Sequence, residues 1–377
     1  MLCESLLNLF FRHVPCNDEL FLIRLWFTMK KREKIIIGVA SIVLIVAGFL
    51  NYSHANAVLS FTINAVALAL LAKIVGDGTE QLGRRFGPAA TGILQSALGN
   101  LPELFVCIFA LKAGLDQVVQ AALIGSILAN SLLVLGLAIL TGGLKNGKQV
   151  FVSNPLKMIT TLMILALAVL AIPTLSYLFH SQEAKHINQL DIFLAIILLV
   201  IFIANIFVSL KGDTARENKV SEKASWPLPL TIIVLCLTGV AAGFVSDWFV
   251  TALKPAMTAL DINDNFAGLV IVAIAGNAIE NFVGIQLAYK NQMDYSMSVI
   301  MNSSLQIALG LFPLLVLLSF FLGGSILSFV ITPMLLVSLA LSVIVSAFII
   351  LDGESIWLEG LALIGLYLLI AASFWWG

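Results

Sequence analysis

Eleven long apolar runs constrain the fold of this chain more than any other feature of its sequence. The runs cover residues 35–51, 57–75, 89–112, 117–141, 156–178, 189–210, 228–246, 265–289, 294–320, 325–350 and 356–376. Each is close to the ~20 residues that cross the hydrocarbon core of a bilayer as a helix. Lipid offers no partner to a bare backbone, and the runs are too long and uniform for barrel strands. The sequence therefore predicts an all-α polytopic membrane protein with about 11 transmembrane helices.

Composition and motifs exclude several other classes of protein. Of the 377 residues, 60% are hydrophobic and 11% are charged, whereas soluble globular proteins carry roughly 25% charged residues. A net charge of −1 gives no indication of nucleic-acid binding. The four cysteines and four histidines have no metal-type spacing. No G-x-S-x-G or HExxH motif indicates a membrane-embedded lipid transferase or protease, so we do not expect an enzyme.

The basic residues indicate how the helices are oriented. Two of the 20 Lys and Arg residues lie in the first 28 residues. With the N-terminus inside, 15 of the other 18 fall on the inner side, and only Lys112, Lys185 and Lys254 fall outside. This asymmetry follows the positive-inside rule. It predicts an integral protein of a bacterial plasma (inner) membrane.

The first 28 residues do not resemble the rest of the chain. They mix charged residues with apolar runs too short to span a bilayer, and they lack the pattern of a signal peptide. Met29 is followed by four basic residues among the next five and then by an apolar run, which is typical of the start of a bacterial inner-membrane protein. Residues 1–28 are therefore either an upstream extension from a misplaced start codon or a short interfacial amphipathic segment.

A polar segment near the middle divides the chain into two halves. Residues 211–227 form a linker that the basic residues place in the cytoplasm. After a first transmembrane helix within 29–56, five helices fall in 57–210 and five in 228–377. Because five is odd, two such repeats have opposite orientations in the membrane, which is the inverted-repeat plan of many secondary transporters.

An internal repeat supports this division. The segment Gly-Asn-x-x-Glu occurs in both halves, and Asn100 and Glu103 precede Asn277 and Glu280 by 177 residues. Ser126 and Ser303 have the same separation. Matched polar positions of this kind stand out against a background of Leu, Ile and Val, so we expect the two halves to be related.

Glu103 and Glu280 are the only acids that we place well inside the apolar spans. A charge at that depth is costly and commonly marks an ion or substrate path. Gly99, Pro102 and Gly276 lie beside them and predict helix breaks, whose bare carbonyls are tolerated where they line a cavity. The structural alternatives are a protonated or lysine-paired carboxyl and a simple kink.

Neutral polar residues accompany the two acids. Ser126 and Asn130 share one helix face at i, i+4, as do Asn302 and Gln306. Such residues also form ordinary interhelical hydrogen bonds. An all-oxygen ligand set without sulfur or imidazole favours a hard divalent cation, and Ca2+ accepts a more flexible geometry than Mg2+.

The charges also predict coupling to protons. Two empty carboxylates in a low-dielectric site repel each other and are poorly solvated, and both effects favour protonation. One divalent cation neutralises the pair, and so do two protons. A carrier that reorients only when neutral would exchange the cation for protons.

The two motifs, with GSILANSLLVLG after the first and NSSLQIALGLFPLLV after the second, resemble the alpha-repeats of the cation/Ca2+ exchanger superfamily. The segments FALKAGLDQVVQAALIGSILANSLLVLG and AYKNQMDYSMSV resemble its Ca2+/H+ exchanger (CAX) branch. The resemblance covers about residues 57–376 and implies antiport by alternating access through a sliding gating bundle, with Ca2+ and H+ as transported ions and no resident cofactor. By position, it implies these ligands: Glu103, Glu280, Asn100, Asn277, Ser126, Asn130, Ser303 and Gln306.

Departures from the family pattern keep alternatives open. The sequence Leu101-Pro102-Glu103 resembles the sodium/calcium exchanger branch, and Asn302-Ser303 stands where the family usually has Gly-Ser. Gln306 favours protons, because a sodium site would be expected to keep an acid there. The alternatives are a Na+/Ca2+ exchanger, a passive cation channel and, of another class, a membrane-embedded enzyme. The sequence makes no prediction of oligomeric state.

Overall fold

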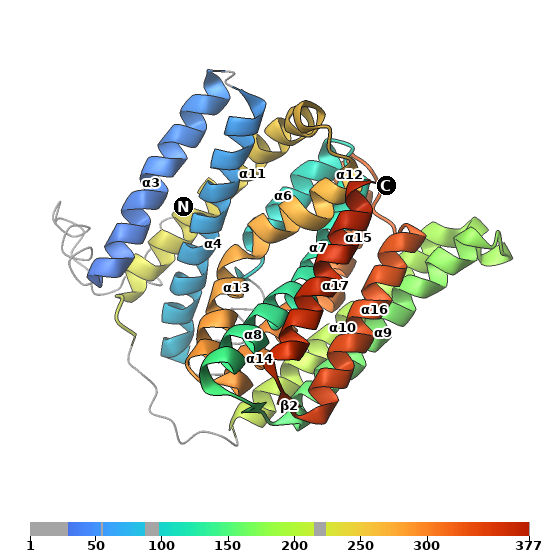
Figure 1. The fold of residues 1–377 in the computed structure, drawn as a ribbon. Coiled ribbons are helices and arrows are strands. Elements are labelled where there is room, and N and C mark those ends of the chain that lie inside the picture. Colours follow the sequence, from blue (N-terminus) through green and yellow to red (C-terminus); the bar gives the residue numbers. More distant parts are fainter. Residues whose placement is uncertain (1–28, 54–55, 87–97, 215–223, 377) are drawn as a thin grey trace.

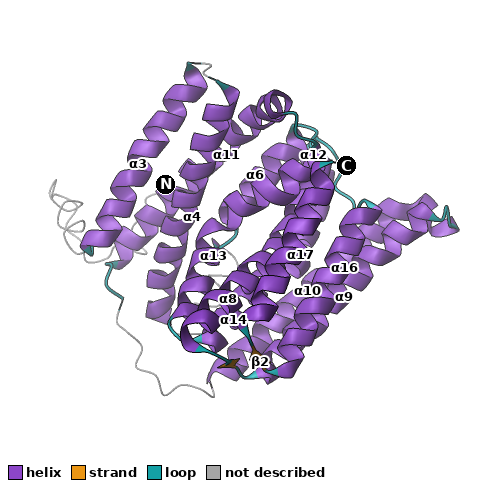
Figure 2. Cartoon of the chain, in the orientation of Figure 1, coloured by secondary structure: helices purple, strands orange, loops and turns teal. Residues whose placement is uncertain are grey.

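The computed structural model describes residues 29–53, 56–86, 98–214 and 224–376, and nearly all of them are helical (Figures 1 and 2). The α-helices are α3 (Lys31–Tyr52), α4 (Ala57–Phe86), α6 (Leu101–Lys112), α7 (Asp116–Leu128), α8 (Leu135–Asn146), α9 (Ser153–Leu178), α10 (Ile187–Thr214), α11 (Leu228–Leu260), α12 (Asp264–Phe266), α13 (Ala273–Tyr289), α14 (Met293–Gln306), α15 (Phe312–Leu322), α16 (Pro333–Asp352) and α17 (Trp357–Trp375). Three π-helical segments are η1 (Ala129–Val134), η3 (Ala267–Val272) and η4 (Ile307–Leu311), and η2 (Gln182–His186) is a 3-10 helix. The strands β1 (Gln149–Val150) and β2 (Glu354–Ser355) pair antiparallel.

The helices have the length and composition of membrane spans. Among the described residues, nine helical stretches are long and apolar enough to cross a bilayer. A tenth forms if Asp264–Asn277 and Phe282–Tyr289, which meet at 63°, make one bent span. These findings confirm the all-helical membrane fold. The expected span 89–112 falls partly outside the described residues, so the count of eleven stays a prediction. The segment 1–28 lies wholly outside them.

The apolar run 325–350 is not helical throughout. Gly323 ends α15 with a positive φ of 73°, and α16 begins only at Pro333. Proline fits the first turn of a helix because it has no N–H to satisfy there. The intervening segment is apolar yet irregular, and Gln120 of α7 donates hydrogen bonds of 3.0 Å to the carbonyls of Ser328 and Val330. Hydrophobicity alone therefore placed the start of this helix too early.

The secondary structure repeats with the same spacing as the polar motifs. Helix α7 begins at Asp116 and α14 at Met293, 177 residues later. Each continues into a π-helical segment, η1 or η4, and then into α8 or α15. Short π-helical segments inside α-helices are rare and occur frequently at functional sites. Their recurrence supports the relation between the two halves.

The spans differ in how deeply they lie in the bundle (Figure 1). In the most apolar 18 residues of Asp116–Asn146, 83% of the residues are buried, whereas in those of Lys31–Tyr52 only 11% are buried. Helix α4 packs along α11, where the rings of Phe61 and Phe249 stack 4.7 Å apart. The core thus centres on α7, η1 and α8, with α3 at the periphery.

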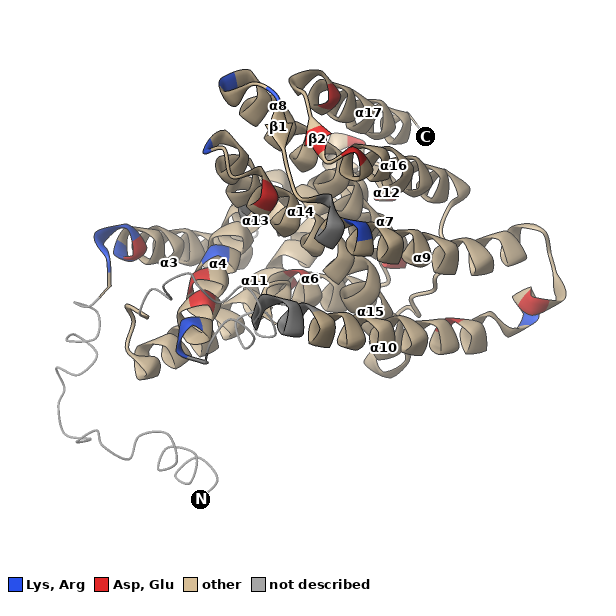
Figure 3. Cartoon of the chain, turned by 90° about the horizontal axis from the view of Figure 1, so that it is seen from below, with Lys and Arg blue, Asp and Glu red and all other residues tan. Residues whose placement is uncertain are grey.

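One end of the bundle carries a polar cap (Figure 3). Lys148 forms a 2.6 Å ion pair with Glu354, and β1 pairs with β2 beside it. The amino group of Lys145 lies 3.6 Å from the centre of the Tyr289 ring. These contacts tie the α8–α9 connection to α13 and to the α16–α17 connection, at the end that the basic residues assign to the inner side.

Two core helices cross in close contact at glycines. A Cβ atom on Gly125 of α7 would lie 2.3 Å from the carbonyl oxygen of Leu269. A Cβ atom on Gly268 of η3 would lie 2.4 Å from the carbonyl oxygen of Val118. Small residues allow membrane helices to approach in this way. The crossing holds the first half of the chain directly against the second.

Gly125→Ala should therefore destabilise the protein, although alanine is the better helix former. The new methyl group meets backbone atoms, so the helices must separate, and we expect the melting temperature in detergent to fall by about 5 °C or more. Gly243→Ala on α11 is the matched control, because its Cβ meets nothing within 4 Å. Equal melting temperatures for the two variants would contradict this packing.

Candidate cation site

The start of α6 positions Glu103. Gly99 and Asn100 form a turn, and Asn100 is the residue that precedes the helix. Pro102 and Glu103 occupy its first turn, where a missing N–H breaks no bond and a carboxylate is stabilised by the positive end of the helix dipole. The chain therefore leaves helical geometry immediately before the buried acid.

Glu103 is joined to both halves of the chain by hydrogen bonds. Its side chain is only 6% exposed, and its Oε1 accepts a 2.7 Å hydrogen bond from the hydroxyl of Ser126 on α7. The same hydroxyl accepts a 2.8 Å bond from Nδ2 of Asn277 on α13. Nδ2 of Asn277 also donates to the carbonyl of Ala273 at 3.1 Å. The Asn277 amide thus orients the Ser126 hydroxyl toward Glu103.

A second polar layer joins the two π-helical junctions. Nδ2 of Asn130 donates to the hydroxyl of Ser303 at 3.0 Å, and both residues are buried. The hydroxyls of Ser131 and Ser304 lie 3.3 Å apart. Gln306 is the last residue of α14 and is half-buried. Polar residues that the sequence assigned to separate halves therefore meet across the centre of the molecule.

Helix α13 carries the second glutamate. Glu280 lies in α13 between Asn277 and Phe282, where the helix axis bends, and its side chain lies outside the described set. Gly276, which the sequence predicts at a helix break, lies in α13 just before this bend. A Cβ on Gly276 would come 3.7 Å from Cδ of Glu103, so this glycine lies against the carboxylate.

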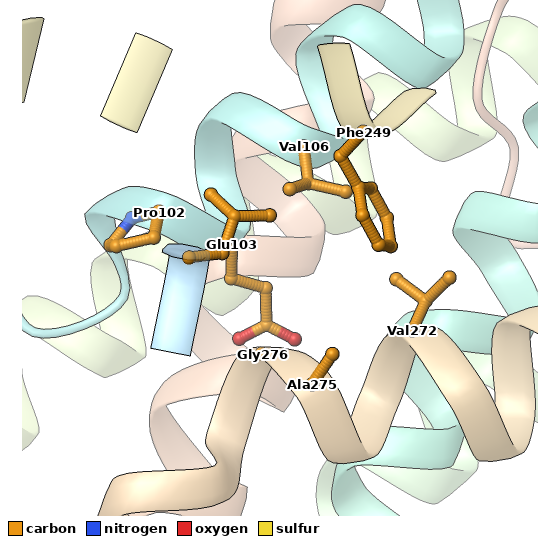
Figure 4. Close-up of a pocket in the computed structure, with 8 residues that line it drawn as sticks. Pro102, Glu103, Val106, Phe249, Val272, Ala275 and Gly276 are labelled. Carbon is orange, nitrogen blue, oxygen red and sulfur yellow. The ribbon is translucent and has the colours of Figure 1, made fainter. Parts of the chain in front are cut away.

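A cavity opens beside Glu103 (Figure 4). It is small, with a cavity volume of about 10 Å³, which is about the size of one water site. Its lining consists of Leu68, Pro102, Glu103, Val106, Phe249, Val272, Ala275 and Gly276. Glu103 supplies the only charge in this lining, and its carboxylate points toward α13 at Gly276. An acid in an apolar cavity can bind a cation or a proton strongly, because little water competes for it.

A further acid, which the sequence pattern did not single out, is buried in the bundle. Asp191 lies near the start of the run 189–210, on α10, and its side chain is fully buried. It lies beside Ser328 and the backbone of Phe329, in the irregular segment before α16. Its place inside an apolar run was the signal that could have identified it. Among the described residues, no three His, Cys, Asp or Glu side chains gather as metal ligands.

Comparison with known proteins gives consistent matches over nearly the whole chain. The family model described as "Sodium/calcium exchanger protein" matches residues 56–211 and 230–376. A Ca2+/H+ antiporter of Aphanothece halophytica is 31% identical over 86% of this chain and 92% of its own length. The Ca2+/H+ antiporter ChaA of Bacillus subtilis is 32% identical over 85% of this chain and 93% of its own length. A crystal structure of the Ca2+/H+ antiporter protein YfkE superposes on this chain with a TM-score of 0.77. The two are 28% identical in sequence, and the match covers 91% of this chain and all of the YfkE chain.

Ser126→Ala should destabilise the protein, because it leaves Glu103 and Asn277 without the hydroxyl that both contact. We expect the free energy of unfolding to fall by about 1–3 kcal/mol, measured by denaturation in detergent. Ser346→Ala is the matched control, since this buried hydroxyl only bonds the carbonyl of Val343 in its own helix. A loss no larger than that of the control would contradict the bridging role of Ser126.

Proposed function

Because this chain belongs to the sodium/calcium exchanger protein family, whose members are transporters and not enzymes, we propose that it exchanges Ca2+ for H+ across the membrane by alternating access. The observation that carries the proposal is the buried Glu103 carboxylate, bridged through Ser126 to Asn277 of the other half. Relatives named as Ca2+/H+ antiporters align over most of this chain and over more than nine-tenths of their own length. The bacterial antiporters among these relatives favour the plasma (inner) membrane as its location.

Each half supplies one glutamate to the cation. Glu103 of repeat 57–210 and Glu280 of repeat 228–377 balance the two charges of Ca2+. Neutral oxygens complete its coordination, supplied by Asn100, Asn277, Ser126, Asn130, Ser303 and Gln306. Asn277 uses its Nδ2 on Ser126 and Ala273, which leaves the amide oxygen for the cation. A set of six to eight oxygens in flexible geometry suits Ca2+.

Protons replace Ca2+ at the same two carboxylates. When the cation leaves, two ionised acids in an apolar cavity are unfavourable, so protonation follows. The site is then neutral with either occupant, and the protein reorients in both directions without moving a bare charge through lipid. The hydroxyl of Ser126 can donate to Glu103 in either state, so the bridge to Asn277 persists throughout the cycle.

A Na+/Ca2+ exchanger is the second candidate. The sequence Leu101-Pro102-Glu103 favours it, because Leu-Pro-Glu resembles that branch, and Pro102 lies in the first turn of α6 beside the acid. Gln306 favours protons, because a neutral amide offers sodium less charge than an acid would. The two candidates share the fold and differ in the driving ion.

Uptake of 45Ca2+ into proteoliposomes separates the candidates. We expect an imposed pH gradient to drive uptake without sodium, and a sodium gradient at equal pH to drive none. Uptake with sodium alone would replace the proposal with the second candidate. Ca2+ flux that persists without any counter-gradient would indicate a channel.

Glu103→Gln and Glu280→Gln should each abolish pH-driven uptake. Glutamine keeps the size of the side chain but removes the charge and the titratable proton, so the rate should fall by at least about 100-fold. Glu183→Gln is the matched control, because Glu183 lies on the exposed segment η2 far from the cavity lining. Normal uptake by either buried variant would refute the site assignment.

A further inference from the structure

Polar atoms are buried without partners between α4 and α11. Asn64 on α4 and Ser246 on α11 are both fully buried. Among the described residues, neither the amide atoms of Asn64 nor the hydroxyl of Ser246 has a hydrogen-bond partner. Such groups cost stability, and in native proteins they call for a function, a water or an ion. Neither residue belongs to the ligand set proposed above.

The packing of the two helices puts these side chains at one level. The Phe61 and Phe249 rings stack, and a Cβ on Gly78 would lie 2.8 Å from Leu235, so α4 and α11 run antiparallel. Asn64 follows Phe61 by three residues on α4, and Ser246 precedes Phe249 by three residues on α11. In antiparallel helices these two steps run in the same direction from the stacked rings. Both side chains are fully buried and lie at matching levels of α4 and α11, and we call this level of the interface the polar layer.

This layer adjoins the cavity at Glu103. Leu68, which lines the cavity, follows Asn64 by four residues and therefore shares its helix face. Phe249, also in the lining, follows Ser246 by three residues. Figure 4 shows the Phe249 ring in the cavity wall, between Val106 and Val272. The polar layer thus lies one helical turn from two residues of the wall, although neither Asn64 nor Ser246 is itself in the lining.

We propose that Asn64 and Ser246 form a transit site, where their oxygens replace part of the water shell of a divalent cation on its way to or from Glu103. Carboxamide and hydroxyl oxygens are ligands that hard cations accept. Both side chains are neutral, so they favour passage without holding the cation tightly as the glutamates do. This inference rests on the proposed exchange of Ca2+.

The test is an Asn64→Leu/Ser246→Ala double variant, which keeps the approximate shapes and removes the polar atoms. We expect the initial rate of pH-driven 45Ca2+ uptake to fall about tenfold, the effect of losing one hydrogen bond to a charged group. Equilibrium 45Ca2+ binding to the protein in detergent should stay unchanged, and the melting temperature should not fall, because unsatisfied groups are removed. Ser246→Ala alone should give a smaller loss of rate.

Thr238→Val is the matched control, since this buried hydroxyl on α11 bonds the carbonyl of Val234 in its own helix; its rate should equal that of the wild type. A wild-type rate in the double variant overturns the transit site. So does a slower rate accompanied by weaker Ca2+ binding or a lower melting temperature, because the two side chains then support the structure or the glutamate site. If the wild-type protein takes up no Ca2+, the proposed function fails first.

Discussion

The carboxyl group of Glu103 lies in an apolar cavity, where an unneutralised charge costs several kcal/mol. The surrounding structure reduces this cost by local means. Helix α6 begins just before Glu103, Ser126 donates to its Oε1, and Gly276 leaves space against it. None of these neighbours carries a charge. A buried carboxyl group in such surroundings is suited to bind a cation or a proton.

The two halves of the chain meet at this acid. Asn277 of the second half orients Ser126 of the first, and Asn130 bonds Ser303 one layer away. The close crossing at Gly125 and Gly268 holds α7 against η3, so that these short side chains can reach each other. These hydrogen bonds therefore link the two halves of the chain directly at Glu103.

Much of this arrangement could be predicted from the sequence. The apolar runs predicted the helices. Asn100, Glu103 and Ser126 predicted the 177-residue repeat, because polar residues stand out among the apolar residues of membrane spans. Contacts between distant helices could not be predicted, since the spacing of residues fixes a helix face but not its neighbour. Composition also missed the irregular segment before Pro333, because apolar residues fill loops that lie inside a membrane protein as readily as they fill helices. The buried Asp191 was missed because it lies only two residues from the start of its apolar run.

Shared use of the carboxylates by Ca2+ and protons is the central claim, and proton release on Ca2+ binding tests it most directly. Ca2+ would be added to the detergent-solubilised protein in weakly buffered solution at several pH values, with a pH indicator reporting the protons released. We expect the wild-type protein to release protons as it binds Ca2+. The number of protons released should rise as the starting pH is lowered, because the empty site is then more fully protonated. The Glu103→Gln variant should release fewer protons than the wild type. Ca2+ binding to the wild-type protein without proton release at any pH would contradict the claim.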